Sequence, residues 1–497
     1  MKFSKSLFLL FSFLILVSCS KDDGKIEFTF LQVNDVYEIA PIQGGKYGGM
    51  ARLETVHQDL LAENKNTMLM MAGDFLNPSL LGTMKYQGDR IRGKQMIEVM
   101  NAMNFDLVAF GNHEFDLSKN DLQKRMDESI FPWISANVFH KDTDSIKPFV
   151  QNNKDLQGSF IKEIADADGT KIKIGFVSVC IPSNPRSYVK YTEMYDAIQK
   201  EYESIKDQVD VVFGLTHVKI AQDRKIAELL PNIPLIMGGH EHTHKNEIVG
   251  EVMIRKADAN AKSAYIHKIT FDTKTKKTIV NSELKEITDA IQEEKNVAMV
   301  VDKWQTVLKN QISQVVANPN EVIYNAKTPL DGRDTPIRST QTNLGEIISN
   351  SMMFAFKDSD CAIVNGGSIR IDDQLVGDID GVDIFRVLPY GGPVLKVKMK
   401  GSLLKKVIGY GFKAQGTGAY LQRSNNITHY GGKTTLNGKS IISSKIYTVA
   451  VSDFLMKGFD IPFLKPDNDG VVSVYKPKDG ELAFDIRKSV IEYMKSL

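Results

Sequence analysis

The chain has 497 residues, of which 42% are hydrophobic and 25% are charged, and its formal net charge is +1. At about 100–200 residues per domain, this length predicts two or three domains, and the pattern of apolar runs fits two large ones. A near-neutral chain lacks the basic surface that binds nucleic acid polymers or anionic membranes, so we expect neither partner.

The first residues have the pattern of an export signal. Two lysines precede an apolar run over residues 7–17, which is too short to span a bilayer as a stable anchor. The run ends in Leu16-Val17-Ser18-Cys19, which resembles a lipobox, and Ser20-Lys21-Asp22-Asp23 looks like the acidic export tag of surface lipoproteins in Bacteroidetes-type bacteria. We therefore expect residues 1–24 to be signal and tether. Lipid on the cysteine would be the protein's only membrane contact, at the periplasmic or cell-surface face of the outer membrane.

Alternating short apolar runs and segments of helical period extend from Ile26 to about Asp272, which is typical of layered α/β folds. Residues 273–320 are polar, rich in Lys and Glu and without a strand-like run, and a helix is expected through Val297–Val316. This segment is interpreted as a helical linker, and Glu321–Leu497 is long enough for a second domain.

Two cysteines remain beyond the lipobox, Cys180 and Cys361, and each lies inside an apolar run. A free buried cysteine behaves as a small hydrophobic residue. The sequence therefore predicts neither a disulfide framework nor a thiolate metal site.

Five times in the N-terminal half, an apolar run ends directly in residues that can bind a metal ion. The runs and the blocks that follow them are Phe28–Val33 with Asn34-Asp35, Met68–Ala72 with Gly73-Asp74, Leu107–Phe110 with Gly111-Asn112-His113-Glu114-Phe115-Asp116, Val211–Leu215 with Thr216-His217, and Leu235–Met237 with Gly238-Gly239-His240-Glu241-His242. As strands, all five place polar residues at carboxyl ends, where α/β sheets build their sites. One such residue alone is usually a cap or a surface group. Together, the oxygen and nitrogen donors suit Zn, Mn, Fe or Co better than Ca or Mg.

These blocks, in this order, resemble the signature of calcineurin-like metallophosphoesterases of the 5'-nucleotidase family. The resemblance implies a four-layer α/β/β/α metallophosphoesterase domain over residues 25–272, followed by an α+β substrate-binding domain over residues 321–497. It also implies two divalent metal ions and a catalytic dyad. One ion would be held by Asp35, Asp74 and His242, the second by Asp74, Asn112, His217 and His240, and the dyad would be His113 with Asp116.

One position departs from the family pattern. The family usually has His two residues after the first Asp, and this chain has Tyr37. Tyr is a poor ligand unless it is deprotonated, so the first site is expected to be weaker, completed by water or selective for a different metal. The role of Tyr37 stays open.

The expected chemistry follows from what phosphoryl transfer needs. Two metal ions supply a hydroxide nucleophile at neutral pH and clamp the phosphate oxygens through an in-line displacement. His113, oriented by Asp116, would stabilise the departing alkoxide or donate a proton to it.

The resemblance continues through the C-terminal half and implies a substrate pocket. Arg338, Asn365 and Arg370 would contact the phosphate or its surroundings, Tyr390 and Phe454 would sandwich the base, and Asp460 would bind the ribose hydroxyls. Arg recognises phosphate through its planar fork, and aromatic faces stack on any base. Two positions differ from the family: Tyr390 stands where Phe is usual, and Gly458-Phe459-Asp460-Ile461 replaces Gly-Gly-Asp-Gly.

The sequence therefore predicts two-metal hydrolysis of phosphate monoesters, with nucleoside 5'-monophosphates as the leading substrates. A phosphatase for sugar phosphates or cyclic nucleotides would use the same site. A surface lipoprotein that binds a phosphorylated ligand without turnover is the third alternative, and it leaves the dyad unexplained. No feature of the sequence indicates an oligomeric state.

Overall fold

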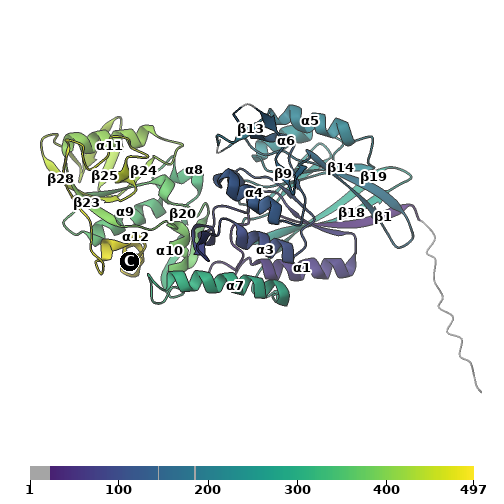
Figure 1. The fold of residues 1–497 in the computed structure, drawn as a ribbon, viewed down its shortest axis with the longest axis horizontal. Coiled ribbons are helices and arrows are strands. Elements are labelled where there is room, and N and C mark those ends of the chain that lie inside the picture. The colour runs from purple at the N-terminus through teal and green to yellow at the C-terminus, as the bar shows by residue number, and fades with distance from the viewer. Residues whose placement is uncertain (1–22, 144, 184–185) are drawn as a thin grey trace, which may run out of the picture.

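The computed structural model describes residues 23–143, 145–183 and 186–497 (Figure 1). The expected signal, the lipobox cysteine and most of the export tag fall in residues 1–22 and lie outside the described residues. Within the described part of the chain, every helix is too short or too polar to span a bilayer. Cys180 and Cys361 are both buried free thiols, as the sequence predicts.

The N-terminal domain is built on two six-stranded sheets. In spatial order the first contains β19 (Lys277–Glu286), β18 (Ser263–Asp272), β1 (Lys25–Val33), β2 (Thr67–Met71), β5 (Leu107–Ala109) and β6 (Trp133–Ile134). The second contains β11 (Ser159–Ala165), β12 (Lys171–Val177), β14 (Val211–Thr216), β15 (Leu235–Gly238), β17 (Val252–Lys256) and β16 (Lys245–Val249). In each sheet the central strands run parallel.

The two sheets face each other across an apolar core. Phe28 and Phe30 of β1 contact Phe213 of β14, with ring centroids 6.0 and 5.0 Å apart. Residues 28–33 of β1 and all of β14 are buried, so both faces are covered there, and the sequence does not alternate regularly between apolar and polar residues. Burial of this kind is what makes the strand ends identifiable from the sequence.

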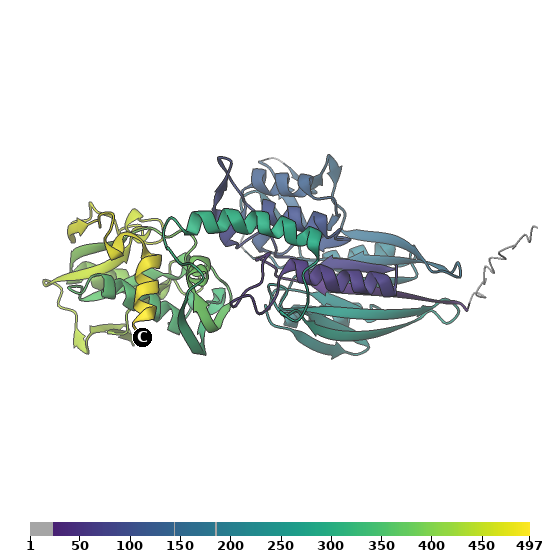
Figure 2. The same ribbon diagram turned by 90° about the horizontal axis from the view of Figure 1, so that it is seen from below.

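Helices cover the outer face of each sheet, which gives the predicted four layers (Figures 1 and 2). The first sheet packs against α1 (Met50–Glu63), α3 (Lys94–Ala102), α4 (Lys119–Glu128) and α7 (Lys295–Ile312), and the second packs against α5 (Met194–Ile205) and α6 (Ile220–Leu229). Trp304 of α7 is fully buried and donates its indole N–H to Glu98 of α3 at 3.0 Å.

The segment between the domains differs from the sequence prediction. Residues 277–286 form β19, a strand at the edge of the first sheet, so the strand framework of the N-terminal domain extends beyond residue 272. Val280 is the one buried residue of this strand, and its other side chains are exposed or half-buried. An edge strand with so few apolar residues gives no strand signal in composition. The linker helix α7 lies within the predicted region.

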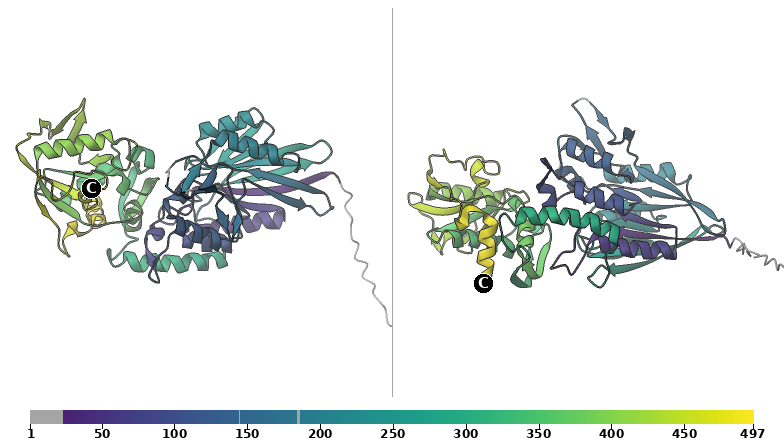
Figure 3. Two further views of the ribbon diagram at one scale, coloured as in Figure 1. Left: turned by 45° about the horizontal axis from the view of Figure 1, so that its top comes forward. Right: turned by 60° about the horizontal axis from the view of Figure 1, so that its bottom comes forward.

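The C-terminal domain is an α+β unit. Its five-stranded sheet has the order β24 (Leu421–Arg423), β21 (Cys361–Asn365), β28 (Ile446–Ser452), β23 (Val394–Lys400) and β29 (Val471–Tyr475). One face packs against α9 (Asn343–Ala355) and α12 (Ile486–Lys495), and the other against α11 (Gly401–Lys413). Figure 3 shows this domain beside the N-terminal domain, and α7 lies along the N-terminal domain and leads to the C-terminal one.

Smaller elements complete the described chain. Near the domain junction are α8 (Asp334–Ile337), α10 (Gly381–Val387) and the paired strands β20 (Val322–Asp331) and β22 (Gln374–Asp380). The remaining short strands and α-helix are α2 (Leu80–Thr83), β3 (Lys85–Tyr86), β4 (Asp89–Arg90), β7 (Val138–Lys141), β8 (Ile146–Lys147), β9 (Val150–Gln151), β10 (Lys154–Asp155), β13 (Val189–Tyr191), β25 (Ile427–Tyr430), β26 (Lys433–Leu436) and β27 (Lys439–Ser440). Short 3-10 helices are η1 (His113–Asp116), η2 (Gly366–Ser368), η3 (Leu455–Lys457) and η4 (Leu482–Phe484). One continuous apolar cluster runs from α1 and α3 along α7 into the C-terminal domain.

Candidate metal centre and substrate pocket

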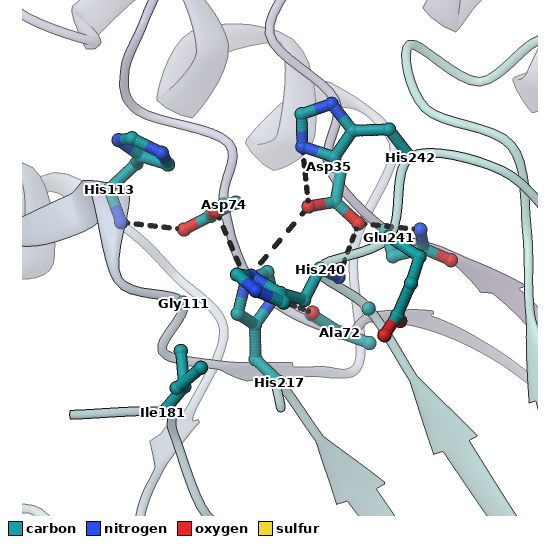
Figure 4. A network of polar contacts seen from close by, with 12 residues as sticks. Asp35, Ala72, Asp74, Gly111, His113, Ile181, His217, His240, Glu241 and His242 are labelled. Carbon is teal, nitrogen blue, oxygen red and sulfur yellow. Dashed lines mark hydrogen bonds and ion pairs between the residues drawn. The ribbon is translucent and has the colours of Figure 1, made fainter. Parts of the chain in front are cut away.

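All five predicted ligand blocks lie at the carboxyl ends of strands of the two sheets. β1, β2 and β5 are neighbours in the first sheet, and β14 and β15 are neighbours in the second. Because the sheets face each other and these strands run parallel, the loops at their carboxyl ends meet at one end of the sandwich (Figure 4).

The two aspartates each have one carboxylate oxygen held by hydrogen bonds and one directed at imidazoles. Asp35 Oδ2 accepts from the side chain of Asn34 at 2.7 Å and from the backbone N–H of His240 at 2.9 Å, while Oδ1 lies 3.3 Å from His242 Nε2. Asp74 Oδ1 accepts from the backbone N–H of His113 at 2.7 Å, while Oδ2 lies 3.0 Å from His217 Nε2. Asp35 Oδ1 and Asp74 Oδ2 therefore point into one space (Figure 4).

Backbone carbonyls orient the histidines. His217 Nδ1 donates to the carbonyl of Ala72 at 2.8 Å, and His242 Nδ1 donates to the carbonyl of Asp372 at 2.6 Å. In both residues this leaves Nε2 as the nitrogen that faces the aspartates. Such outer partners fix the tautomer and ring orientation of metal-binding histidines.

The arrangement fits divalent metal ions. Ligand atoms of Asp35, Asp74 and His217 all lie within 4.8 Å of one another, and all three residues are buried. Asp35 Oδ1, His217 Nε2 and Asn112 Oδ1 are buried atoms without a hydrogen-bond partner. Orphaned polar atoms in a protein interior cost free energy, which a bound cation would recover. All three belong to the predicted ligand set.

His240 joins this group from the β15 loop. Its ring centroid lies 5.4 Å from that of His217. Burial, together with the neighbouring His217, lowers the pKa of His240 to about 3, so its imidazole is neutral, the form that binds metals. The structure thus gathers the six predicted ligands, Asp35, Asp74, Asn112, His217, His240 and His242, at one end of the sandwich.

The backbone of the ligand loops is strained. Four predicted ligands have positive φ angles: Asp35 (54°), Asp74 (58°), His240 (92°) and His242 (60°). Residues other than glycine rarely adopt this region, and such strain concentrates at functional sites. Gly73, at φ 79°, lies so close to Gly111 that an added Cβ would come within 2.6 Å of its backbone nitrogen.

Tyr37 lies between two predicted ligands of the first site, Asp74 and His242. Its hydroxyl is 3.3 Å from Asp74 Oδ2, to which it donates, and 3.1 Å from His242 Nε2. Burial and the carboxylates of Asp74 and Asp35 raise the pKa of Tyr37 well above its ordinary value. The phenol is therefore neutral and acts as a hydrogen-bond donor in the ligand cluster.

Glu114 is a site residue that the sequence pattern did not single out. Its fully buried carboxylate accepts four backbone N–H groups, from Asp74 at 2.9 Å, Phe75 at 2.8 Å, Leu76 at 3.1 Å and Gly111 at 2.7 Å. It fastens the β2 loop to the β5 loop. Burial and the charge of Asp74 nevertheless raise the pKa of Glu114 to about 7.

The predicted dyad is formed. His113 Nδ1 lies 2.8 Å from Asp116 Oδ2. Burial opposes the charged imidazole, but Asp74 and Asp116 outweigh it and raise the pKa of His113 to about 10. Cations bound at Asp74 would offset part of that carboxylate charge. Arg370 of the C-terminal domain lies 3.4 Å from Asp116, so the dyad stands at the domain junction.

His113 borders two cavities. A cavity of about 540 Å³ is also bordered by Asp74, Asn112 and His240. A cavity of about 340 Å³ is also bordered by Tyr390 and by four arginines, Arg92, Arg186, Arg338 and Arg370. Arg92 and Arg186 come from the N-terminal domain and were not predicted, because an isolated arginine in a loop has no distinguishing sequence pattern.

The other predicted substrate residues lie on the C-terminal domain. Asn365 donates to Asp460 at 2.7 Å, and the ring of Phe454 lies 5.8 Å from that of Phe459. Tyr390 is 60% exposed, and no ring contact joins it to Phe454 among the residues that the structure describes. The rings of Tyr390 and Phe454 therefore do not cover each other.

This fold and site define a metal-dependent phosphoesterase. Residues 28–244 match the family model of the calcineurin-like phosphoesterases, and residues 322–465 match that of the 5'-nucleotidase C-terminal domain. The chain therefore belongs to the metallophosphoesterases with a 5'-nucleotidase C-terminal domain, and it is a metal-dependent phosphoric ester hydrolase.

Named relatives share this domain pair over most of their length. The chain is 27% identical to the snake venom 5'-nucleotidase of Naja atra over 81% of each chain. It is 28% identical to the 5'-nucleotidase of Homo sapiens, over 80% of this chain and 74% of that one. The crystal structure of a 5'-nucleotidase precursor from Thermus thermophilus has the same fold, with a TM-score of 0.66 and 21% identity over 95% of this chain and 96% of that one.

The first prediction concerns Glu114. Glu114→Gln removes one of the two acceptor oxygens and turns an amide group toward backbone N–H donors. A buried donor left without a partner costs about 1–3 kcal/mol. We therefore expect the free energy of unfolding, measured in urea, to fall by about 2 kcal/mol or more. Calorimetric titration with Mn²⁺ should show weaker binding.

Glu63→Gln is the matched control, because Glu63 pairs with Lys268 at 2.7 Å where both side chains are 58% exposed. Its unfolding free energy should change by less than about 0.5 kcal/mol. Equal behaviour of the two variants would show that Glu114 does not hold the ligand loops together.

Proposed function

We propose that the protein hydrolyses nucleoside 5'-monophosphates at a two-metal site, outside the cytoplasm. The observation that carries the proposal is the position of His113. It lies between a cluster of metal-binding side chains and a cavity that is bordered by arginines and an aromatic ring. A phosphate ester bound beside this residue would have its phosphate between the metal-binding side chains and the arginines, and its leaving group toward Tyr390.

The residues at the junction support transfer of a proton to the leaving oxygen. Asp116 is held by the side chain of Asn77 at 2.8 Å and by Arg186 at 3.1 Å, so it keeps the ring of His113 in one orientation. His113 borders both cavities, and its Nε2 would donate to the departing alkoxide. When bound, the divalent ions activate water at neutral pH and neutralise phosphate oxygens. The donor set suits Zn, Mn, Fe or Co.

The C-terminal domain supports a nucleoside as the leaving group. Tyr390 and Phe454 each leave ring area uncovered, and Asp460 lies beside Asn365 at hydrogen-bond distance. These groups would stack on a base and accept from the ribose hydroxyls. Phe459 contacts Phe454 and is 72% exposed, so it would make the surface around these groups more apolar than the glycine that is usual in the family.

The lipobox pattern at Leu16-Val17-Ser18-Cys19 supports a lipid anchor at the outer membrane. Together with phosphate release, this location would serve the recovery of phosphate and nucleosides from nucleotides that do not cross the membrane.

Phosphate release is the direct test. The chain without residues 1–19, stripped with EDTA, should release phosphate from AMP only after Mn²⁺, Zn²⁺ or Co²⁺ is added. His113→Ala should lower kcat by a factor on the order of 10²–10⁴, as loss of a general acid does. Faster release from sugar phosphates or cyclic nucleotides than from AMP would favour those substrates. No release from any of them would favour the binding-protein alternative.

Another prediction concerns the base of the nucleotide. Stacking contributes roughly 1–3 kcal/mol per base, so Tyr390→Ala or Phe454→Ala should lower kcat/KM for AMP by about 5- to 150-fold. A small aryl phosphate that does not reach these rings serves as the control substrate, and its hydrolysis should be nearly unchanged. Parallel losses for both substrates would mean that the rings support the fold and do not bind the base.

A further inference from the structure

The first metal site has fewer ligands in the N-terminal domain than the family pattern provides. Tyr37 stands at the usual histidine position, and its hydroxyl is engaged with Asp74 and His242. Asp35, Asp74 and His242 are then the protein ligands that this domain offers to the first ion. In a catalytic metal site, three protein ligands leave a fourth position open, which water or a further side chain can fill.

A carboxylate from the other domain points into the same space. Asp372 lies in the loop between Arg370 and β22 and is largely buried, with 15% of its side chain exposed. Its Oδ1 accepts the backbone N–H of Asp334 at 2.6 Å. Its Oδ2 lies 3.6 Å from His242 Nε2 and 3.8 Å from His113 Nε2. One oxygen is therefore anchored, and the other faces the ligand cluster.

The backbone of Asp372 also contacts His242. Its carbonyl accepts His242 Nδ1 at 2.6 Å, which turns His242 Nε2 toward the site. The residue has a φ angle of 45°, in the region that L-residues rarely adopt. Strain at a non-glycine position is maintained only when the surroundings require that conformation. Here the conformation lets one residue orient a ligand through its carbonyl and present a carboxylate beside it.

The distances suit one shared ion. Nitrogen and oxygen ligands at about 2.0–2.2 Å from a tetrahedral ion lie roughly 3.3–3.6 Å from each other. The pair Asp35 Oδ1 and His242 Nε2 is 3.3 Å apart, and the pair His242 Nε2 and Asp372 Oδ2 is 3.6 Å apart. Two carboxylates at this separation from one imidazole leave room for a cation between the three groups.

We propose that Asp372 of the C-terminal domain is a ligand of the first metal ion and replaces the ligand that Tyr37 does not provide. The ion then joins the two domains, at a junction where Lys262 also pairs with Asp373 at 3.1 Å and Arg386 pairs with Glu38 at 3.4 Å. The proposal concerns the metal site and does not depend on which phosphate ester is the substrate.

Calorimetric titration of the EDTA-treated full chain with Mn²⁺ tests the proposal without any assay of activity. Asp372→Asn preserves the size of the side chain, tolerates the positive φ, and keeps an oxygen for the Asp334 N–H. It should weaken one of the two binding events by about 10-fold or more, the range seen when partners of a metal site are removed. The other event should be unchanged.

Two further variants make the result specific. Asp373→Asn is the control, because it breaks the neighbouring pair with Lys262 and leaves the ligand cluster untouched, so both binding events should persist. Tyr37→His combined with Asp372→Asn restores an imidazole at the usual position and should recover the lost affinity. Rescue would separate ligation from a general loss of folding.

Unchanged Mn²⁺ affinity in a folded Asp372→Asn variant would overturn the proposal. If that variant also bound inorganic phosphate more tightly, the carboxylate of Asp372 would be occupying the position of the phosphate and would not be a metal ligand. An equal loss of affinity in Asp373→Asn would also contradict it, because domain contact in general would then control the metal.

Discussion

The carboxylate of Glu114 accepts four backbone N–H groups in the interior of the N-terminal domain, and these come from the loops that follow β2 and β5. Each loop contributes a predicted metal ligand, Asp74 in one and Asn112 in the other. Without this carboxylate, four buried donors would have no partner, and the two loops would have no common anchor. The relative position of the ligands therefore depends on a residue that is not itself a ligand.

The electrostatics of the site follow from the close approach of its carboxylates. Holding Asp35 and Asp74 close together in a buried region concentrates negative charge. The effect is visible in the raised pKa of His217, about 9, where Asp74 and Asp35 outweigh the burial that would lower it. Such a cluster is stable only with compensating positive charge. Protonated histidines supply it in the absence of metal, and divalent cations would supply it in the loaded enzyme while the histidines become ligands.

The sequence was sufficient to predict what depends on local order along the chain. Buried parallel strands are continuous apolar runs, so their ends, and the ligand blocks that follow, could be located at Asp35, Asp74 and His217 before the structure was known. Strand β19 escaped prediction because an edge strand buries almost nothing, and only Val280 carries an apolar signal toward the core. Propensity and pattern are weakest where burial is smallest.

The parts of the site that depend on contacts between distant segments could not be predicted. Asp372 is separated from His242 by 130 residues, and Arg186 is separated from Asp116 by 70. Nothing in their neighbouring sequence distinguishes them from solvated charges. The ligand roles assigned by resemblance to Asn112 and His240 agree with where these residues lie, and the stacking roles of Tyr390 and Phe454 remain predictions.

The most direct measurement for the two-metal centre is anomalous diffraction from crystals grown with Mn²⁺, recorded on both sides of the manganese absorption edge. The account predicts two peaks a few ångströms apart that share Asp74, one beside Asp35 and His242 and the other beside Asn112, His217 and His240. A single peak, or peaks away from these residues, would contradict it.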